Sequence, residues 1–250
     1  MKKYLFVDLD DTLFSSLAKC ADQADLQAVA FLKDGSACSF TTSKQRAFLS
    51  MASRSMTLIP TTARNSDAFG RVDLVFDDYK IIDYGGVVLE PGGMPDPIWL
   101  QKMRDEMAAA LPGLCQAKAL IDEFSQRAGL PGRARLIEDY GIPFYVVVKD
   151  PDKLAERLAL IERDALRPWM ASEGTDFYIH RNGTNLVVLP KTLDKAHAVE
   201  YVIGLLRESH GQVMTMGMGD SRSDARFMTA CDYAILPSGT QLEALLLGAP

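Results

Sequence analysis

Residues 6–14 read Phe-Val-Asp-Leu-Asp-Asp-Thr-Leu-Phe (FVDLDDTLF), and they continue an apolar run that begins at Tyr4. A short run that is apolar on both faces is typical of a buried strand in a parallel sheet. This run ends at three aspartates within four positions, namely Asp8, Asp10 and Asp11. Carboxylates this close repel each other, so something else at the end of the strand must offset the cost.

The composition is that of a folded globular protein. The chain has 250 residues, of which 48% are hydrophobic and 24% are charged. This length allows one large domain, or a core with a smaller inserted domain. The formal net charge of −6 and the absence of any basic run argue against nucleic acid as a partner. No apolar run is long enough to span a bilayer, so no membrane partner is expected.

The cysteines indicate a reducing compartment. The chain has 4 of them, widely spread and without a CxxC pair, and its 3 histidines share no ligand spacing with them. This pattern predicts free thiols and gives no support for a zinc site. The N-terminal apolar run is broken at Asp8, far too early for a signal peptide. We therefore expect a cytoplasmic protein.

Strands and helices alternate at both ends of the chain, and a block of mixed α+β texture lies between them. The alternation predicts an α/β fold with a Rossmann-like, doubly wound parallel sheet. In the first part we expect a hairpin at 28–40 turning at Asp34-Gly35, a helix capped by Ser43 that runs to about residue 53, and strands at 56–59, 74–76 and 81–82.

The middle block predicts two helices, 97–113 and 114–132, each closed by Gly or Pro-Gly. It continues with strands at 135–137 and 143–150, a helix at 150–168 stopped by Pro168, and a hairpin at 177–190 turning at Asn182-Gly183. The original texture then returns, with a helix around 198–206 and strands at 213–218 and 233–236.

Polar clusters follow three of the outer strands where each strand ends: DLDDT at 8–12, TTARN at 61–65 and GDSRSD at 219–224. Ligands of open α/β sheets bind outside the carboxyl ends of the strands, so these clusters are expected to meet. Together they place four carboxylates at one edge of the sheet, those of Asp8, Asp10, Asp220 and Asp224. Mg²⁺ resolves such crowding, because it prefers oxygen ligands and commonly sits beside a substrate phosphate. The nearby groups suited to phosphate oxygens are the hydroxyls of Thr12, Thr61, Thr62 and Ser221 and the ammonium of Lys195.

The order of these motifs resembles that of the haloacid dehalogenase superfamily. The four motifs are Asp8-Leu9-Asp10-Asp11-Thr12, Thr62-Ala63-Arg64, Lys195, and Gly219-Asp220-Ser221-Arg222-Ser223-Asp224. An α+β insert between the second and third motifs resembles the branch with a large cap, which includes sucrose-phosphate, mannosyl-3-phosphoglycerate and Cof-like phosphatases. The resemblance implies a catalytic core at 1–86 and 187–250 and an α+β cap domain at 87–186.

This sequence departs from the family pattern at three places. Tyr84-Gly85 stands where relatives often have Asn-Gly, and Leu186-Val187-Val188 lacks an acidic residue that is common there. Asp11 stands where Gly is commonest, and we interpret Asp11 as a turn or cap residue. These departures bear on the substrate more than on the reaction.

The chemistry of the residues suggests their roles, and the resemblance supports them. Asp8 is the expected nucleophile, which forms an aspartyl-phosphate, and Asp10 the general acid and base. Thr62 and Lys195 are expected to hold the phosphoryl oxygens. The expected Mg²⁺ site consists of Asp8, Asp10 through its backbone carbonyl, Asp220 and Asp224, the last of which orients the metal's waters or Lys195. Substrate contacts are expected from Thr61, Arg64, Ser221, His180 and Arg181.

The sequence thus predicts a Mg²⁺-dependent phosphomonoester hydrolase whose partner is a small phosphorylated metabolite such as a sugar phosphate. Two alternatives stay open at this point. A phosphomutase of the same superfamily would use the same nucleophile, and a regulatory protein could bind a phosphorylated ligand without catalysis. The sequence leaves open the oligomeric state and the role of the 28–40 hairpin.

Overall fold

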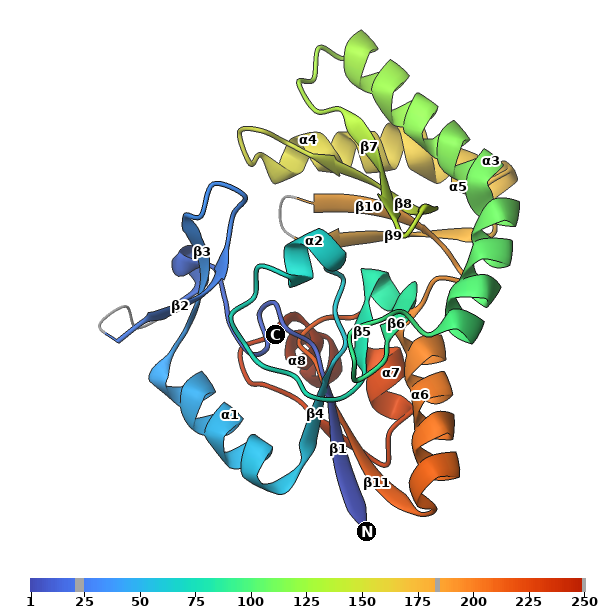
Figure 1. Ribbon diagram of the computed structural model, residues 1–250. Helices are drawn as coiled ribbons and strands as arrows, with labels where there is room; N and C mark the ends of the chain where they lie inside the picture. The colour runs from blue at the N-terminus through green and yellow to red at the C-terminus, as the bar shows by residue number, and fades with distance from the viewer. Residues whose placement is uncertain (21–24, 183–184, 249–250) are drawn as a thin grey trace. The chain divides into compact units, whose positions relative to one another are not determined.

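The computed structural model describes residues 1–20, 25–182 and 185–248. The chain forms two compact units, which are here called unit 1 (Met1–Leu100 with Asp194–Pro250) and unit 2 (Gln101–Leu193). Helix α3 (Pro97–Arg127) starts in unit 1 and continues into unit 2 (Figure 1). The domain limits expected from the sequence, at 86/87 and 186/187, stay a prediction.

Unit 1 contains a parallel sheet with the strand order β12-β11-β1-β4. In its centre, Phe6 pairs with Ile59 on one side and with Gly217 on the other. Figure 1 shows α1 and α6 on opposite sides of these strands, which confirms the predicted doubly wound α/β architecture. The elements are β1 (Lys2–Val7), α1 (Ser43–Ser55), β4 (Thr57–Pro60), α6 (Lys195–His210), β11 (Val213–Met218) and β12 (Tyr233–Ile235).

The two helices begin at side-chain caps. Thr42 and Gln45 form a reciprocal capping box at the start of α1, so the cap is one residue earlier than the expected Ser43. Asp194 caps α6 by accepting a hydrogen bond from the Ala196 N–H at 2.8 Å. The apolar face of α6 is buried, and its members are Ala198, Val199, Val202, Ile203 and Leu206.

Smaller elements complete unit 1. The expected hairpin is confirmed, with its turn at Gly35, where φ is +83°. The strand expected at 74–76 is wrong: these residues lie outside every strand, with Val75 85% exposed, Phe76 buried and Leu74 partly buried against the core. The elements are β2 (Gln27–Phe31), β3 (Ala37–Thr41), α2 (Ser66–Phe69), β5 (Lys80–Ile82), β6 (Val87–Leu89), α7 (Ala225–Thr229), α8 (Gln241–Leu247) and 3-10 turns at Leu17–Lys19 and Asp83–Gly85.

Unit 2 contains an antiparallel sheet with the order β7-β8-β10-β9. Its hydrophobic core joins the sheet residues Val146 and Val188 to Leu114 and Ile121 of α3. Strands β9 and β10 pair as expected, whereas residue 183 of their turn lies outside the described residues. The strands are β7 (Ala134–Asp139), β8 (Ile142–Lys149), β9 (Phe177–Asn182) and β10 (Asn185–Pro190).

Two helix boundaries in unit 2 differ from the expectation, and both involve proline. The two helices expected at 97–113 and 114–132 are one helix, α3, which passes through Pro112. The helix expected to stop at Pro168 continues to Ser172. It consists of α4 (Ala155–Ile161), a π-helical turn at Glu162–Leu166 and α5 (Arg167–Ser172). Pro168 thereby falls in the first turn of α5, where its missing N–H does little harm.

Within the described ranges, no helix combines the length and the apolar character needed to cross a bilayer. All four cysteines are free.

Candidate active site

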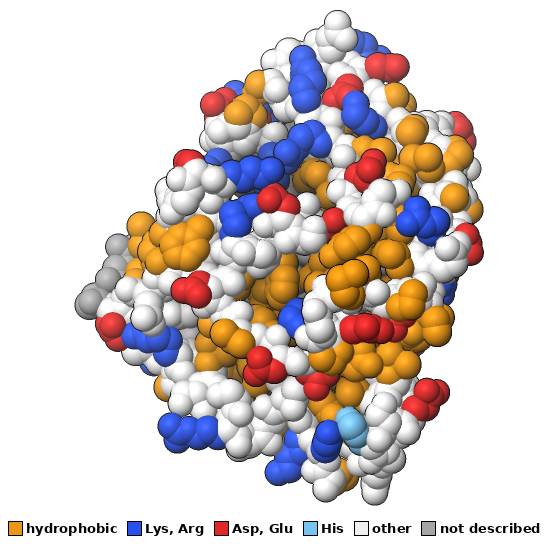
Figure 2. Space-filling model, viewed as in Figure 1, with side chains coloured by type: hydrophobic (Ala, Val, Ile, Leu, Met, Phe, Trp, Pro, Cys, Tyr) orange, Lys and Arg blue, Asp and Glu red, His pale blue; other side chains and the backbone are white. Residues whose placement is uncertain are grey.

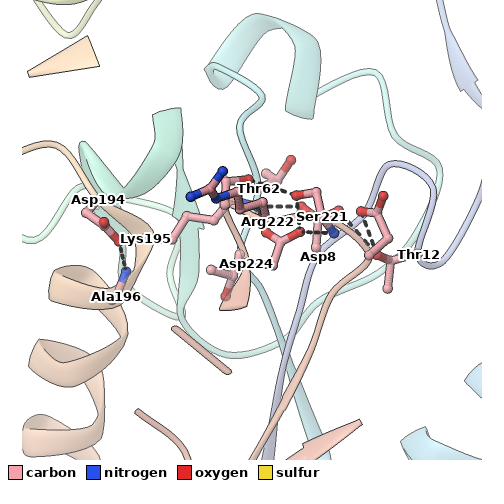
Figure 3. A network of polar contacts seen from close by, with 12 residues as sticks. Asp8, Thr12, Thr62, Asp194, Lys195, Ala196, Ser221, Arg222 and Asp224 are labelled. Atoms are coloured by element: carbon pink, nitrogen blue, oxygen red, sulfur yellow. Dashed lines mark hydrogen bonds and ion pairs between the residues drawn. The ribbon is translucent and has the colours of Figure 1, made fainter. Parts of the chain in front are cut away.

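The three polar clusters predicted from the sequence follow the carboxyl ends of β1, β4 and β11, all in unit 1. Figure 3 shows Asp8, Thr12, Ser221, Asp224 and Lys195 gathered in one network of polar contacts. The parallel register explains this meeting, since Val7 pairs with both Pro60 and Met218. The chain therefore leaves all three strands at the same level of the sheet.

Three buried carboxylates form the centre of the site. Oxygen atoms of Asp8, Asp220 and Asp224 all lie within 4.8 Å of one another. Asp8 is held by its backbone N–H, which donates to the Met218 carbonyl at 2.9 Å. Gly219 allows Asp224 to approach, because a Cβ at position 219 would lie 2.4 Å from the Asp224 Cβ. The glycine of the fourth motif is thus a steric requirement of the cluster.

Lys195 is the cation of this cluster. It is the first residue of α6, and its Nζ donates to Asp8 Oδ1 at 2.6 Å and to Asp224 Oδ1 at 2.7 Å. Burial lowers the pKa of Lys195, but the carboxylates of Asp224 and Asp8 more than compensate, so that the pKa is raised overall. The ammonium therefore stays charged and fixed between the two carboxylates.

The site carries more negative than positive charge. Burial, and next the carboxylates of Asp224 and Asp11, raise the pKa of Asp220 to about 7. Burial is also the main reason that the pKa of Asp8 is raised well above its usual value. The Thr12 hydroxyl lies between the two groups, 3.4 Å from Asp8 Oδ2 and 3.3 Å from Asp220 Oδ1. A crowded set of oxygen donors with excess negative charge fits Mg²⁺.

Asp10 points to a different partner. Arg64 Nε donates to Asp10 Oδ2 at 2.8 Å, and Arg64 Nη2 donates to Asp10 Oδ1 at 2.7 Å. The Arg64 guanidinium also lies over the Phe14 ring, 5.2 Å from its centroid. Arg64, which we expected to bind substrate, thus orients Asp10 in this structure. Asp11 forms an ion pair with Lys19 and has a φ of +63°, in the left-handed region that glycine adopts readily.

The other expected phosphate contacts lie at the same strand ends. The Thr62 hydroxyl accepts a hydrogen bond from the Arg64 N–H at 3.2 Å, and the Thr61 hydroxyl donates to the Ile59 carbonyl at 3.3 Å. Ser221 donates to Asp224 Oδ2 from its hydroxyl at 2.6 Å and from its N–H at 3.0 Å. In this structure Ser221 therefore fixes the carboxylate of Asp224.

His180 and Arg181 lie on β9, which belongs to unit 2. Arg181 Nε is 3.7 Å from Glu162 Oε2. It lines a pocket of about 560 Å³ together with Arg163, Arg167, Glu156, Glu162 and Leu160. Figure 2 shows Lys and Arg side chains gathered where Figure 1 draws α4. The charged groups of this pocket are three arginines and two glutamates, and Ala159 and Leu160 add an apolar part to its lining.

The sequence did not mark Tyr84 as a site residue. Tyr84 is buried, and burial raises the pKa of its hydroxyl. Among the charged groups, Lys195 has the largest effect and lowers this pKa, and Asp8 comes next and raises it. The only signal in the sequence was the departure from Asn-Gly at Tyr84-Gly85.

Comparisons with known proteins give matches among solved structures. No protein-family model and no curated protein sequence matches the chain. The sucrose-phosphatase of Synechocystis sp. PCC6803, in complex with sucrose and phosphate, aligns with a TM-score of 0.57 at 15% identity, over 99% of this chain and 96% of that one. The IMP-bound IMP-nucleotidase of Plasmodium falciparum gives a TM-score of 0.56 at 12% identity, over 97% and 66%. The C-terminal domain of C. albicans trehalose-6-phosphate phosphatase gives 0.55 at 12%, over 92% and 73%. Identities this low show a shared fold.

Proposed function

Since the chain has the fold of the haloacid dehalogenase phosphatases, we propose that it is a Mg²⁺-dependent phosphomonoester hydrolase that acts through an aspartyl-phosphate. One observation carries the proposal: Lys195 is fixed between the carboxylates of Asp8 and Asp224, with Asp220 beside them. A nucleophile, a cation for the phosphoryl group and a metal-binding carboxylate thus lie in one buried cluster.

In the proposed reaction, an oxygen of Asp8 attacks phosphorus and the bond between phosphorus and the leaving oxygen breaks. Asp10 gives its proton to that oxygen, so the product leaves as an alcohol. Asp10 then accepts a proton from water, whose oxygen attacks the aspartyl-phosphate. The products are inorganic phosphate and free Asp8. Arg64 gives the Asp10 carboxylate a fixed orientation in this structure.

Thr62 and Lys195 would hold the phosphoryl oxygens throughout. Asp8, the Asp10 carbonyl and Asp220 would hold Mg²⁺, and Asp224 would fix Lys195 and the ion's waters. When bound, Mg²⁺ would offset the negative charge of the phosphoryl oxygens. Lys195 needs no large movement for this task, because its ammonium already contacts the attacking carboxylate.

The proposed substrate is a small phosphorylated metabolite such as a sugar phosphate. The names of the sucrose-phosphatase and the trehalose-6-phosphate phosphatase among the structural neighbours support this class. Thr61, Arg64 and Ser221 stay proposed contacts for the phosphoryl end. His180 and Arg181 stay proposed contacts for the rest of the substrate, and the pocket that Arg181 lines together with Arg163 and Arg167 supports the inclusion of Arg181. A cytoplasmic location also stays a proposal, which the free thiols favour.

The test is a hydrolysis screen with sugar phosphates, phosphoglycerates, nucleotides and an aryl phosphate, in Mg²⁺ and in EDTA. Asp8→Asn should lower turnover by on the order of 10³-fold or more. Asp11→Asn is the matched control, because Asn tolerates the left-handed backbone found there and Asp11, which pairs with Lys19, takes no part in the proposed bond-making or proton-transfer steps. The proposal fails if Asp8→Asn retains the activity of the Asp11→Asn protein. Product analysis on hexose phosphates separates hydrolysis from a mutase outcome.

A further inference from the structure

Three consecutive residues, Asp83, Tyr84 and Gly85, have left-handed backbone angles, with φ of +53°, +57° and +95°. Only glycine adopts this region readily, so two of the three positions are strained. All three residues are buried, in the 3-10 turn between β5 and β6. Strain of this kind persists where the surroundings enforce it, and it is concentrated at functional sites.

On one side, the turn is bonded to the segment that follows β4. The Tyr84 N–H donates to the Thr62 carbonyl at 3.1 Å, and the Asp83 N–H donates to the Arg64 carbonyl at 2.8 Å. These two hydrogen bonds fix the position of the turn relative to the backbone of Thr62, which we propose holds a phosphoryl oxygen.

On the other side, the turn touches the start of α6. A Cβ added to Gly85 would lie 2.7 Å from the Asp194 carbonyl oxygen and 3.1 Å from the Lys195 Cα. The obstacle is backbone, and this backbone is held by the cap of α6, so it has little freedom to move aside. The Gly85 carbonyl in turn accepts a hydrogen bond from Trp99 Nε1 at 3.0 Å. Gly85 is thus held between a buried indole and the residue that carries the central ammonium.

We propose that Gly85 is a positioning residue for Lys195: the bare backbone of the Asp83–Gly85 turn sets the place of the first turn of α6, and with it the reach of the ammonium to Asp8 and Asp224. This inference rests on the proposed function. It adds a residue outside the four sequence motifs, which acts only through its contact with Lys195.

Gly85→Ala tests the proposal, and Gly93→Ala is its matched control. Gly93 has a φ of +85°, close to that of Gly85, but a Cβ there would meet nothing within 4 Å. Both variants strain a left-handed backbone, and only Gly85→Ala displaces Lys195. We expect Gly85→Ala to lower kcat by up to about 10²-fold, as a misplacement of about 1 Å can do. Gly93→Ala should keep kcat within about threefold of the parent, because the added methyl group disturbs no residue of the site.

A double-mutant cycle with Lys195→Met separates positioning from general damage. If Gly85 acts through Lys195, adding Gly85→Ala to the Lys195→Met protein should lower kcat by less than about threefold. An equal further loss in the Lys195→Met protein would overturn the proposal. Gly85→Asn adds a second check, since Asn tolerates left-handed angles but still carries a Cβ. It should lose as much activity as Gly85→Ala, and full activity would mean that strain alone was responsible.

Two further measurements cover other outcomes. If Gly85→Ala does not fold, Trp99→Phe removes the hydrogen bond to Gly85 without adding an atom, and its loss of kcat should likewise vanish in the Lys195→Met background. Calorimetry with inorganic phosphate needs no turnover: Gly85→Ala should weaken phosphate binding by about as much as Lys195→Met, and Gly93→Ala should not. Unchanged phosphate affinity in Gly85→Ala refutes the positioning role, whereas a parent protein without hydrolysis refutes the proposed function instead.

Discussion

Arg64 holds Asp10 by two parallel hydrogen bonds, at 2.8 Å from Nε to Oδ2 and at 2.7 Å from Nη2 to Oδ1. This fork joins the segment after β4 to the segment after β1, and it orients a carboxylate whose side chain is 45% exposed. Lysine cannot reproduce the paired geometry, because its ammonium is a point donor.

Arg64→Lys should therefore impair proton transfer by Asp10 more than attack by Asp8. We expect kcat to fall by about 10- to 10²-fold on an alkyl phosphate, because general acid catalysis contributes about 10²- to 10⁴-fold in such reactions. On p-nitrophenyl phosphate, whose leaving group needs no proton, the fall should be only about threefold. Parallel kinetics on the two substrates check this, and equal losses on both would contradict it. Arg71→Lys, at a partly exposed ion pair with Asp67 that involves no proposed catalytic residue, is the control.

Lys195→Met should destabilise the protein in the absence of metal. It leaves the buried carboxylates of Asp8 and Asp224 without their cation, and breaking a buried pair in this way costs about 3–5 kcal/mol. Urea unfolding in EDTA measures the loss, and added Mg²⁺ should restore more stability to the variant than to the parent. Lys118→Met breaks only a partly exposed ion pair between Lys118 and Asp122, one turn apart on α3, so it should cost about 0.5 kcal/mol or less. Equal losses in the two variants would show that the Lys195 pairs contribute nothing special.

Asp220 should make the metal-free protein less stable as the pH rises. Its pKa is about 7 in the folded protein, whereas an unfolded aspartate titrates near pH ~4. The folded state thus binds more protons between these values, so stability falls as the pH rises from about 4 to about 7, and the whole penalty is present above that window. In EDTA, Asp220→Asn should gain stability relative to the parent between pH 5 and pH 8. Thermal unfolding of the two proteins at each pH measures this gain, and a stability difference that does not change with pH would contradict the prediction.

Two helical glycines should respond to alanine in opposite directions. Gly113 in α3 packs against Phe177, whose Cε2 and Cζ would lie 2.4 Å from an added Cβ. Gly113→Ala should therefore lower the free energy of unfolding by about 1–3 kcal/mol, as overpacking does. Gly204 in α6 meets nothing within 4 Å, so Gly204→Ala should raise it by about 0.5–1 kcal/mol. Chemical denaturation of both variants checks the pair, and a stabilised Gly113→Ala protein would contradict the tight contact.

The sheet of unit 1 and the meeting of its motifs could be predicted because both follow from short-range patterns. An apolar run that ends in a polar cluster marks a parallel strand, and the parallel register then brings the ends of β1, β4 and β11 to one level. The closeness of Asp8 and Asp220 follows from this register, since each lies within two residues of a strand end, whereas the place of Lys195 in the site was an expectation from the family resemblance.

The helices of unit 2 show where local signals fail. Pro112-Gly113 resembles a helix stop, but α3 continues through it because its buried face continues on both sides. Met107, Leu114, Ala117 and Ile121 are all buried at helical spacing, and their packing outweighs the hydrogen bond lost at proline. The local sequence around residue 112 does not predict those tertiary contacts.

The parts of the site that escaped prediction depend on contacts between distant positions. Arg64 and Asp10 are 54 residues apart, and nothing in either motif shows that the arginine turns to the second aspartate. The role proposed for Gly85 likewise depends on its backbone angle and on the nearness of Lys195, neither of which a composition or a period can reveal.

The position of β11 in the sheet has a consequence for how the protein is made. β1 has β4 on one side and β11 on the other, and the β11 partner of Lys2 is Val213, on the order of 200 residues later in the chain. At a synthesis rate of about 5–20 residues per second, β1 waits roughly 10–40 seconds on the ribosome before that partner emerges. The contiguous residues of unit 2 are complete at Leu193, only about 1–4 seconds before Val213 is added. Asp220 follows β11 in the chain, so Asp8 acquires it only after β11 has arrived, and until then a nascent chain exposes one edge of its first strand to chaperones.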